Sequence, residues 1–241
     1  MSVLGHFFED EGLSTTGISL VREHAEAIRP PRSLWVPFEL GRPLGAPGDP
    51  AFQRRVILAA LELLEAERGP VLADFPDDAA AGSAGEGWAC PVPLPLPEAR
   101  GTGLGAAVAE EVGRLRTWYE AGRRTRERTT VGLSGLEIEA VAAFLAGFLD
   151  DPLQPPFREG LSRGAACKLA SEDLKAFYAE AANAQPGTPS SRRTADWFWG
   201  ETAAGELILE LKRRFDASED KSLKGIAVMA LVPRSQQHRL G

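Results

Sequence analysis

Histidine and cysteine are scarce in this chain of 241 residues, which contains three histidines and two cysteines. The histidines stand at positions 6, 24 and 238, too far apart to form a ligand pair on one helix. Cys90 and Cys167 match the spacing of no zinc or redox motif. Two cysteines also give no disulfide framework, so the sequence predicts reduced thiols and a cytoplasmic location.

Long apolar runs and a basic excess are also absent. No stretch of about 18 apolar residues is present, so we expect no membrane-spanning helix. The first residues, MSVLGHFFEDEG, lack the basic region that begins a signal peptide. The net charge of −7 argues against a broad surface for nucleic acid. The partners that remain are a small-molecule ligand or another protein.

The stretch over residues 12–45 predicts an architecture. Residues 15–21 and 34–40 are rich in β-branched and aliphatic side chains and are bounded by glycine and proline, which indicates two strands. The segment between them, 22–33, is just long enough for a crossover that joins parallel strands. Pro37 lacks a backbone N–H and favours an edge strand or a bulge. We therefore expect a small parallel sheet.

Charged side chains follow both predicted strands. Arg22 and His24 come directly after the first strand, and Arg42 comes after the second. Parallel strands bring their carboxyl ends to one edge of the sheet, where open α/β folds bind small ligands. Two guanidinium groups, the imidazole and the carboxylate of Glu23 would meet there, and the guanidinium groups suit a carboxylate or a phosphate. The alternative is that all three are solvated charges at the starts of loops.

The same stretch resembles a known family. GLSTTGISLV, then RSLWVPFELGRPLG, then DPAFQRRVILAALELLEAE follow the order found in the C-terminal part of protein B of the glycine, sarcosine, betaine and D-proline reductases. The likeness covers about residues 4–67. It implies reductive cleavage of a carbon–nitrogen bond in a small amino acid or betaine. The redox motif of that family, selenocysteine-x-x-cysteine, lies upstream of the matching segment, and residues 1–12 contain no cysteine, so no catalytic residue carries over.

Most of the remaining sequence predicts helices. Asp49 can cap a helix with an apolar stripe, and a second long helix covers residues 104–124. Short apolar runs at 71–75 and 129–133 are typical of strands, and the sequence after them indicates helices alone.

The fold class is thus helix-rich α/β, with a small, parallel sheet in the N-terminal part and an all-helical C-terminal part. The last predicted strand places the boundary after residue 135. Residues 1–135 then form a small α/β part, and residues 136–241 form a helical part that packs against it as one body.

The strongest single candidate in the helical part is Glu201. Residues 195–215 predict one helix, whose inward stripe places Glu201 beside Trp197 among apolar side chains. A carboxylate there must be paired, hydrogen-bonded or protonated. Aromatic walls with one carboxylate suit a quaternary ammonium ligand such as betaine, and together with Glu180 or Asp173 the group could hold a metal. The alternative is a structural, buried Glu201 satisfied by a basic side chain or by backbone donors.

Two further features allow two interpretations each. The basic run GRRTRER, residues 122–128, could bind an anion or an acidic partner, or its charges could complement the dipole at a helix C-terminus. Cys90 could be a reactive thiol or a buried structural residue. Free cysteine usually behaves as a small hydrophobe, and the nearby acidic Glu86 and Glu98 raise the pKa of the thiol, so we expect Cys90 to be buried and slow to react.

These features predict a reductase-like protein, similar to protein B, that acts on a small amino acid or betaine and lacks the redox motif. The alternative is a non-catalytic relative that binds a small ligand or a partner protein. Since the chemistry needs a thiolate or selenolate nucleophile, both alternatives stand, and the sequence names no cofactor. The candidate ligand-binding residues are Arg22, His24, Arg42, Trp197 and Glu201.

Overall fold

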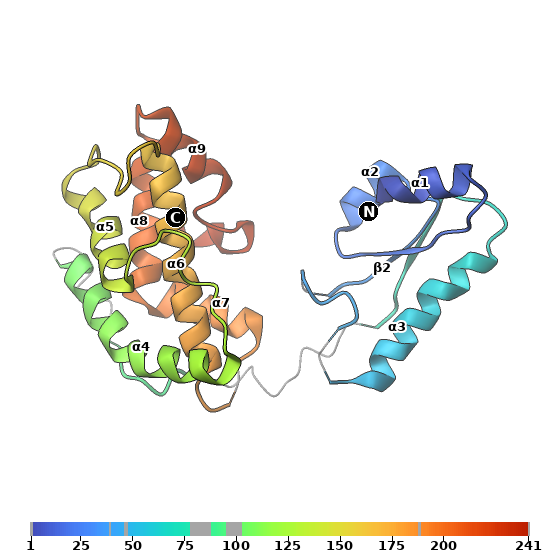
Figure 1. Ribbon diagram of the computed structural model, residues 1–241, viewed down its shortest axis with the longest axis horizontal. Coiled ribbons are helices and arrows are strands. Elements are labelled where there is room, and N and C mark those ends of the chain that lie inside the picture. The colour runs from blue at the N-terminus through green and yellow to red at the C-terminus, as the bar shows by residue number, and fades with distance from the viewer. Residues whose placement is uncertain are drawn as a thin grey trace. The chain divides into compact units, whose positions relative to one another are not determined.

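The computed structural model describes residues 2–38, 40–45, 48–77, 88–94, 103–187 and 189–240. The chain divides into two compact units, Met1–Ser83 and Ala84–Gly241, here called unit 1 and unit 2 (Figure 1). Unit 1 contains a small parallel sheet with helices, and the described elements of unit 2 are helices. The predicted fold class, helix-rich α/β, is therefore confirmed.

The boundary between the units lies well before the predicted one at residue 135. Helix α4 (Leu104–Arg126) falls in the predicted sheet-bearing part, but it packs against α5 (Ile138–Asp150) and α6 (Arg163–Asn183). Residues 129–133, the last predicted strand, form a loop on unit 2. Both segments therefore belong to the helical unit, and the division between the two units falls between residues 83 and 84 instead of after residue 135. The packing of the two parts as one body stays a prediction.

Unit 1 is built on three parallel strands in the order β1 (Gly17–Ser19), β2 (Arg32–Trp35) and β3 (Val71–Asp74). The parallel pairing predicted for the first two strands is confirmed, and the run at 71–75 supplies the third. β2 is the central strand, although Pro37 favours an edge. The strand ends at Trp35, so the missing N–H of Pro37 falls beyond the ladder.

One face of this sheet packs against α3 (Pro50–Glu62). The three strands place Ile18, Leu34 and Ala73 in one row, because these residues are partners in the parallel register. That row belongs to the same apolar core as Val56 and Ala60 of α3, both of which are buried. Side chains on alternate strand positions point to opposite faces, so α3 covers the face that carries this row.

Helices α1 (Ser2–Asp10) and α2 (Arg22–Ile28) complete unit 1. Ala25 is the buried residue of α2. α1 is tied to the start of β2 by an ion pair, in which Arg32 Nη1 lies 2.7 Å from the Glu9 carboxylate. The Arg32 side chain is almost fully buried, and it also donates to the carbonyl of Ala66.

The core of unit 2 surrounds α6, which contacts α4, α5, α7 (Ser191–Glu201) and α9 (Lys221–Met229) (Figure 1). Helix α8 (Ala203–Asp216) packs against α4, α7 and α9. The fully buried side chains of α6 include Cys167, Leu174, Phe177 and Tyr178. Burial of large apolar and aromatic side chains of this kind supplies most of the stability of such a unit.

Residues 195–215 form two helices where the sequence predicts one. The chain is extended at Thr202, with φ −119° and ψ 149°, between α7 and α8. The Thr202 hydroxyl donates to the Phe198 carbonyl at 2.7 Å and accepts the N–H of Gly205 at 3.0 Å, so it ends one helix and caps the next. Gly205 is required there, since a Cβ would stand 2.0 Å from the Phe198 carbonyl oxygen.

Short 3₁₀ segments follow two of the helices, η1 (Leu63–Glu65) after α3 and η4 (Arg234–Leu240) near the C-terminus. Among the residues described, no helix has the length and apolar character needed to cross a membrane.

Asp220 caps α9 and predicts a pH dependence of stability. Its carboxylate accepts the hydroxyl and N–H of Ser222 and the N–H of Leu223, and it pairs with Arg163 at 3.1 Å. These contacts, the Ser222 hydroxyl first, lower the pKa of Asp220 to about 2 from 3.8. A lowered pKa stabilises the fold above the unfolded value, and this contribution disappears as the pH falls from about 4 to about 2.

We expect Asp220→Asn to keep the helix cap and lose only the charge. Asp220→Ala also loses the cap, which should lower the free energy of unfolding by about a further 1 kcal/mol. Urea unfolding at several pH values measures both effects. The difference between the wild type and the Asn variant should shrink as the pH falls from about 4 to about 2. A difference that stays constant over this range would contradict the assigned role of the charge.

Candidate functional site

A charged surface lies at the C-terminal end of α4. Helical spacing places Glu120, Arg123 and Arg124 on one side, because residues three and four positions apart share a face, and Glu127 follows as the residue that caps the helix end. The opposite side carries Leu115, Tyr119 and Gly122, all of which are buried. The buried side therefore fixes which charges point outward.

The end of α4 is held close to α6. A Cβ on Gly122 would stand 2.8 Å from the Cβ of Ala184, so only glycine permits this approach. Arg126 pairs with Glu180 of α6 at 3.2 Å. The Tyr119 hydroxyl lies 3.0 Å from the hydroxyl of Thr129 in the following loop. These contacts keep the last turn of α4 and the start of the loop in place.

Two carboxylates of α6 hold the loop after α4. Glu180 accepts hydrogen bonds from the Thr129 hydroxyl at 2.9 Å and from the Thr130 N–H at 2.7 Å. Asp173 is buried, and it accepts the backbone N–H groups of residues 132, 133 and 134. Burial acts to raise the pKa of Asp173, but these donors and the Ser134 hydroxyl together lower it. Both carboxylates are thus structural, and this corrects their proposed pairing with Glu201 around a metal.

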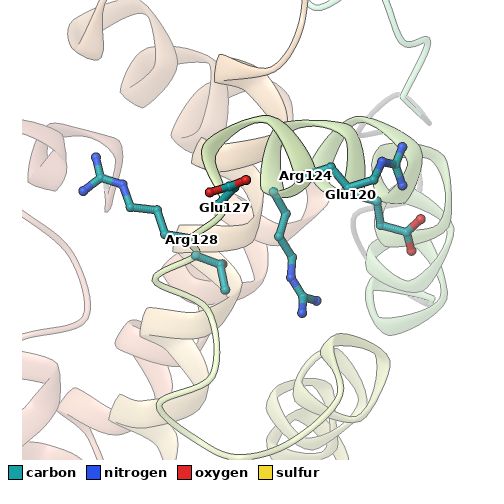
Figure 2. Close-up of a pocket in the computed structure, with 6 residues that line it drawn as sticks. Glu120, Arg124, Glu127 and Arg128 are labelled. Atoms are coloured by element: carbon teal, nitrogen blue, oxygen red, sulfur yellow. The ribbon is translucent and has the colours of Figure 1, made fainter.

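The outward side chains line an open hollow of about 700 Å³. Its lining residues are Glu120, Arg123, Arg124, Glu127, Arg128 and Thr129. Figure 2 shows Arg124 and Arg128 extending in different directions from either side of Glu127. Every residue of this lining is charged or hydroxylated. We call these six residues the arginine surface.

The guanidinium groups of this surface are available for a ligand. Glu120 pairs with Arg116 at 3.6 Å, so its carboxylate is directed along the helix. Across the described parts of the chain, Arg123, Arg124 and Arg128 have no ion-pair partner, and all three are exposed. Most other arginines of unit 2 are paired with carboxylates, namely Arg114, Arg116, Arg126, Arg163, Arg192, Arg193, Arg213, Arg214 and Arg239.

At the edge of the sheet in unit 1, Arg22 crosses the carboxyl ends of the strands. Its Nε and Nη2 atoms lie 3.2 and 3.3 Å from the two carboxylate oxygens of Asp74, at the end of β3. The guanidinium carbon lies 5.9 Å from the centre of the Trp35 ring in β2, and Arg22 also pairs with Glu26. The hydrogen bond with Asp74 raises the pKa of Arg22. Arg22 is thus already engaged by carboxylates of its own chain.

The other two residues predicted at this edge, His24 and Arg42, are both exposed on unit 1. His24 is exposed on α2, and residues two positions apart on a helix point in different directions, so His24 and Arg22 diverge. Arg42 is exposed in a turn after β2, in which the N–H of Gly45 donates a hydrogen bond to the carbonyl of Arg42. No contact described by the structure joins His24 with Arg22, and their convergence in one pocket stays a prediction.

Glu201 is exposed, which corrects the prediction of an inward carboxylate. Its side chain keeps about half of its accessible surface and pairs with Arg193 at 2.6 Å. The helix phase is interrupted at Thr202, so the stripe of α8 does not continue the stripe of α7. Trp197 is buried, with its ring against Trp88 and Tyr178, and it belongs to the core rather than to a ligand wall.

The buried carboxylate of unit 2 is Glu111, which the sequence interpretation missed. It is fully buried on α4 and accepts the N–H of Ala203 at 2.7 Å and of Ala204 at 3.2 Å. It also accepts the Tyr178 hydroxyl at 2.8 Å. Burial raises the pKa of Glu111, while these three donors act against the rise. The signal in the sequence was a glutamate beside Val112, within an apolar stripe of the helix.

Neither cysteine lies in the unit that carries the family resemblance. Cys90 is partly buried and Cys167 is fully buried, and both are free thiols of unit 2. Burial raises the pKa of both, to about 12 for Cys167. The structure describes no group of three or more His, Cys, Asp or Glu side chains that could hold a metal ion within its resolved ranges.

Comparisons with known proteins give no match to this chain, whether against family models, curated proteins or solved structures.

Two matched substitutions test the reassignment of the buried carboxylate. Glu111→Ala should lower the free energy of unfolding by roughly 3 kcal/mol or more, because two backbone N–H groups and the Tyr178 hydroxyl lose their buried acceptor. Glu201→Ala should cost less than about 1 kcal/mol, since exposed ion pairs contribute little. Urea unfolding followed by tryptophan fluorescence measures both, and equal losses would contradict the assignment.

Thiol labelling tests the assigned cysteine environments. At neutral pH we expect no reaction of Cys167, and a reaction of Cys90 about tenfold or more slower than in the urea-unfolded chain, because their raised pKa leaves few thiolates. Mass spectrometry of the digested, labelled protein assigns the modified position. Labelling of Cys90 at the unfolded rate would instead indicate a reactive thiol.

Proposed function

We propose that this protein is a non-catalytic binding protein, which docks an acidic segment of a partner protein on the arginine surface of unit 2. One observation carries the proposal. Arg123, Arg124 and Arg128 are exposed on one hollow and have no ion-pair partner among the residues that the structure describes. In a chain of net charge −7, three such groups on one surface favour carboxylates supplied from outside.

The openness and lining of the hollow favour a protein segment over a small molecule. Small-molecule sites are mostly apolar and bury most of their ligand. The arginine surface has no apolar side chain in its lining. An exposed ion pair contributes roughly 0.2–1 kcal/mol to a binding free energy, so a ligand with one carboxylate binds weakly. A segment with several carboxylates binds more tightly. Glu127 repels carboxylates at its own position and so restricts where the segment can lie.

The reductase activity implied by the resemblance is less well supported. That chemistry needs a thiolate or selenolate. The likeness covers about residues 4–67, within unit 1, whereas both cysteines belong to unit 2 and have a raised pKa. A small ligand at the sheet edge would compete with Asp74 and Glu26 for Arg22. We therefore favour the binding role, in the reducing cytoplasm that two free thiols suit.

Binding of a defined acidic peptide tests this function. A fluorescent peptide with repeated glutamates should bind the wild type, while the same peptide with glutamines should not, because only carboxylates attract the guanidinium groups. The variant R123Q/R124Q/R128Q should bind the acidic peptide at least about tenfold more weakly. Raising the salt from about 0.05 M to about 0.5 M should weaken the wild-type complex.

The matched control is R158Q/R192Q/R234Q, which removes the same number of charges from exposed positions of unit 2 outside the arginine surface. It should bind as the wild type does. An equal loss in this control would show that net charge, not the arginine surface, governs binding. Tighter binding of a single-stranded oligonucleotide than of the acidic peptide would overturn the proposed partner class.

A further inference from the structure

Unit 1 exposes an unusual amount of apolar surface. Most of the large apolar side chains that are exposed in the described residues belong to unit 1, although unit 2 is the longer part. Many of them lie on α3 and on the turn of 3₁₀ helix that continues it. Exposed apolar patches of this kind mark interaction surfaces in soluble proteins.

α3 has two apolar sides. Its inner side, with Val56 and Ala60, packs on the sheet. The other side carries the outer stripe, whose members keep 36–48% of their accessible surface: Ile57, Leu58, Leu61 and Leu64. At about 100° per residue, Leu58 points nearly opposite to Val56 and Ala60, and Leu61 points roughly 100–140° away from them. A helix that is apolar on both sides needs a second partner for the outer one.

Charges of opposite sign stand at the two ends of the outer stripe. Arg54 lies one turn before Leu58 on α3, and Glu65 lies about one turn after Leu61, at the end of the 3₁₀ segment η1 that continues the helix. Both are exposed, and no ion pair of either is formed within the parts of the chain that the structure describes. The sequence spacing from Arg54 to Leu58 equals the spacing from Leu61 to Glu65. The pattern of charge, two leucines and opposite charge is therefore the same when the helix is followed in either direction, with the two signs exchanged.

We infer that two copies of this chain associate through the outer stripe of α3, with the two helices antiparallel about a twofold axis between Leu58 and Leu61. In this register, Leu58 of one copy faces Leu61 of the other, and Arg54 faces Glu65. A twofold interface uses the same patch on both copies and must be self-complementary, as this pattern is. A parallel arrangement would place Arg54 against Arg54 and Glu65 against Glu65.

The charges favour a second copy over a lipid surface. Helices that lie on membranes carry lysine and arginine along their polar side, which attract anionic lipids. Glu62 lies between two members of the outer stripe and Glu65 follows the last of them, and anionic lipids repel both of these exposed carboxylates. A second copy instead satisfies both the apolar side chains and the two flanking charges with the same residues.

Charge reversal at the two ends tests the register. By sedimentation velocity, R54E and E65R should each raise the dimer dissociation constant about tenfold, because two ion pairs become two repulsive contacts. An equimolar mixture of the two variants should dimerise as the wild type does. In the mixed dimer the introduced glutamate of one copy faces the introduced arginine of the other, and the unchanged Glu65 faces the unchanged Arg54. A mixture no stronger than the single variants would overturn the antiparallel register.

Apolar substitutions test the surface itself. L58E should make the chain monomeric at concentrations where the wild type is a dimer, while F7E, at an exposed apolar position on α1, should leave the dimer intact. Circular dichroism checks that both variants are folded, as expected for outward positions. A wild type that remains monomeric at all concentrations, or a dimer that F7E disrupts and L58E does not, would overturn the proposal. The arginine surface is unaffected by either variant, so this test is separate from that of the binding function.

Discussion

The buried carboxylate of Glu111 is the interaction on which unit 2 depends. It joins α4 to Tyr178 of α6 and to the first N–H groups of α8. A helix N-terminus carries unsatisfied donors and a positive partial charge, so an anion there is favourable. Because a carboxylate without water or partners is costly, the three helices must meet at this point to keep it satisfied.

The position of the arginine surface follows from the same constraint. Glu111 and the buried stripe of α4 fix how that helix is rotated, and the rotation decides that Arg123 and Arg124 face outward. Glu180 and Asp173 then hold the next loop on α6, which places Arg128 beside them. The surface is therefore a set of exposed guanidinium groups on a backbone that the carboxylates of α6 hold in place, which reduces the ordering cost of binding.

The sequence predicts those elements whose structure depends on the residues of a single segment. The parallel strands, the Asp49 cap and the long helix before the basic run all follow from composition and spacing. The outward direction of the Glu201 side chain could not be predicted, because it depends on Thr202. The Thr202 hydroxyl ends α7 by donating to a carbonyl and caps α8. The loop at 129–133 could not be predicted from its own residues either, since its hydrogen bonds go to carboxylates some forty residues or more away in the sequence.

The central claim is that carboxylates of a partner bind Arg123, Arg124 and Arg128. Nuclear magnetic resonance of the arginine Nε–H groups, assigned and followed during titration with an acidic peptide, tests it most directly. The account predicts shifts of these three signals and steady signals for Arg158, Arg192 and Arg234. Shifts spread equally over all six, or confined to the second three, would contradict it.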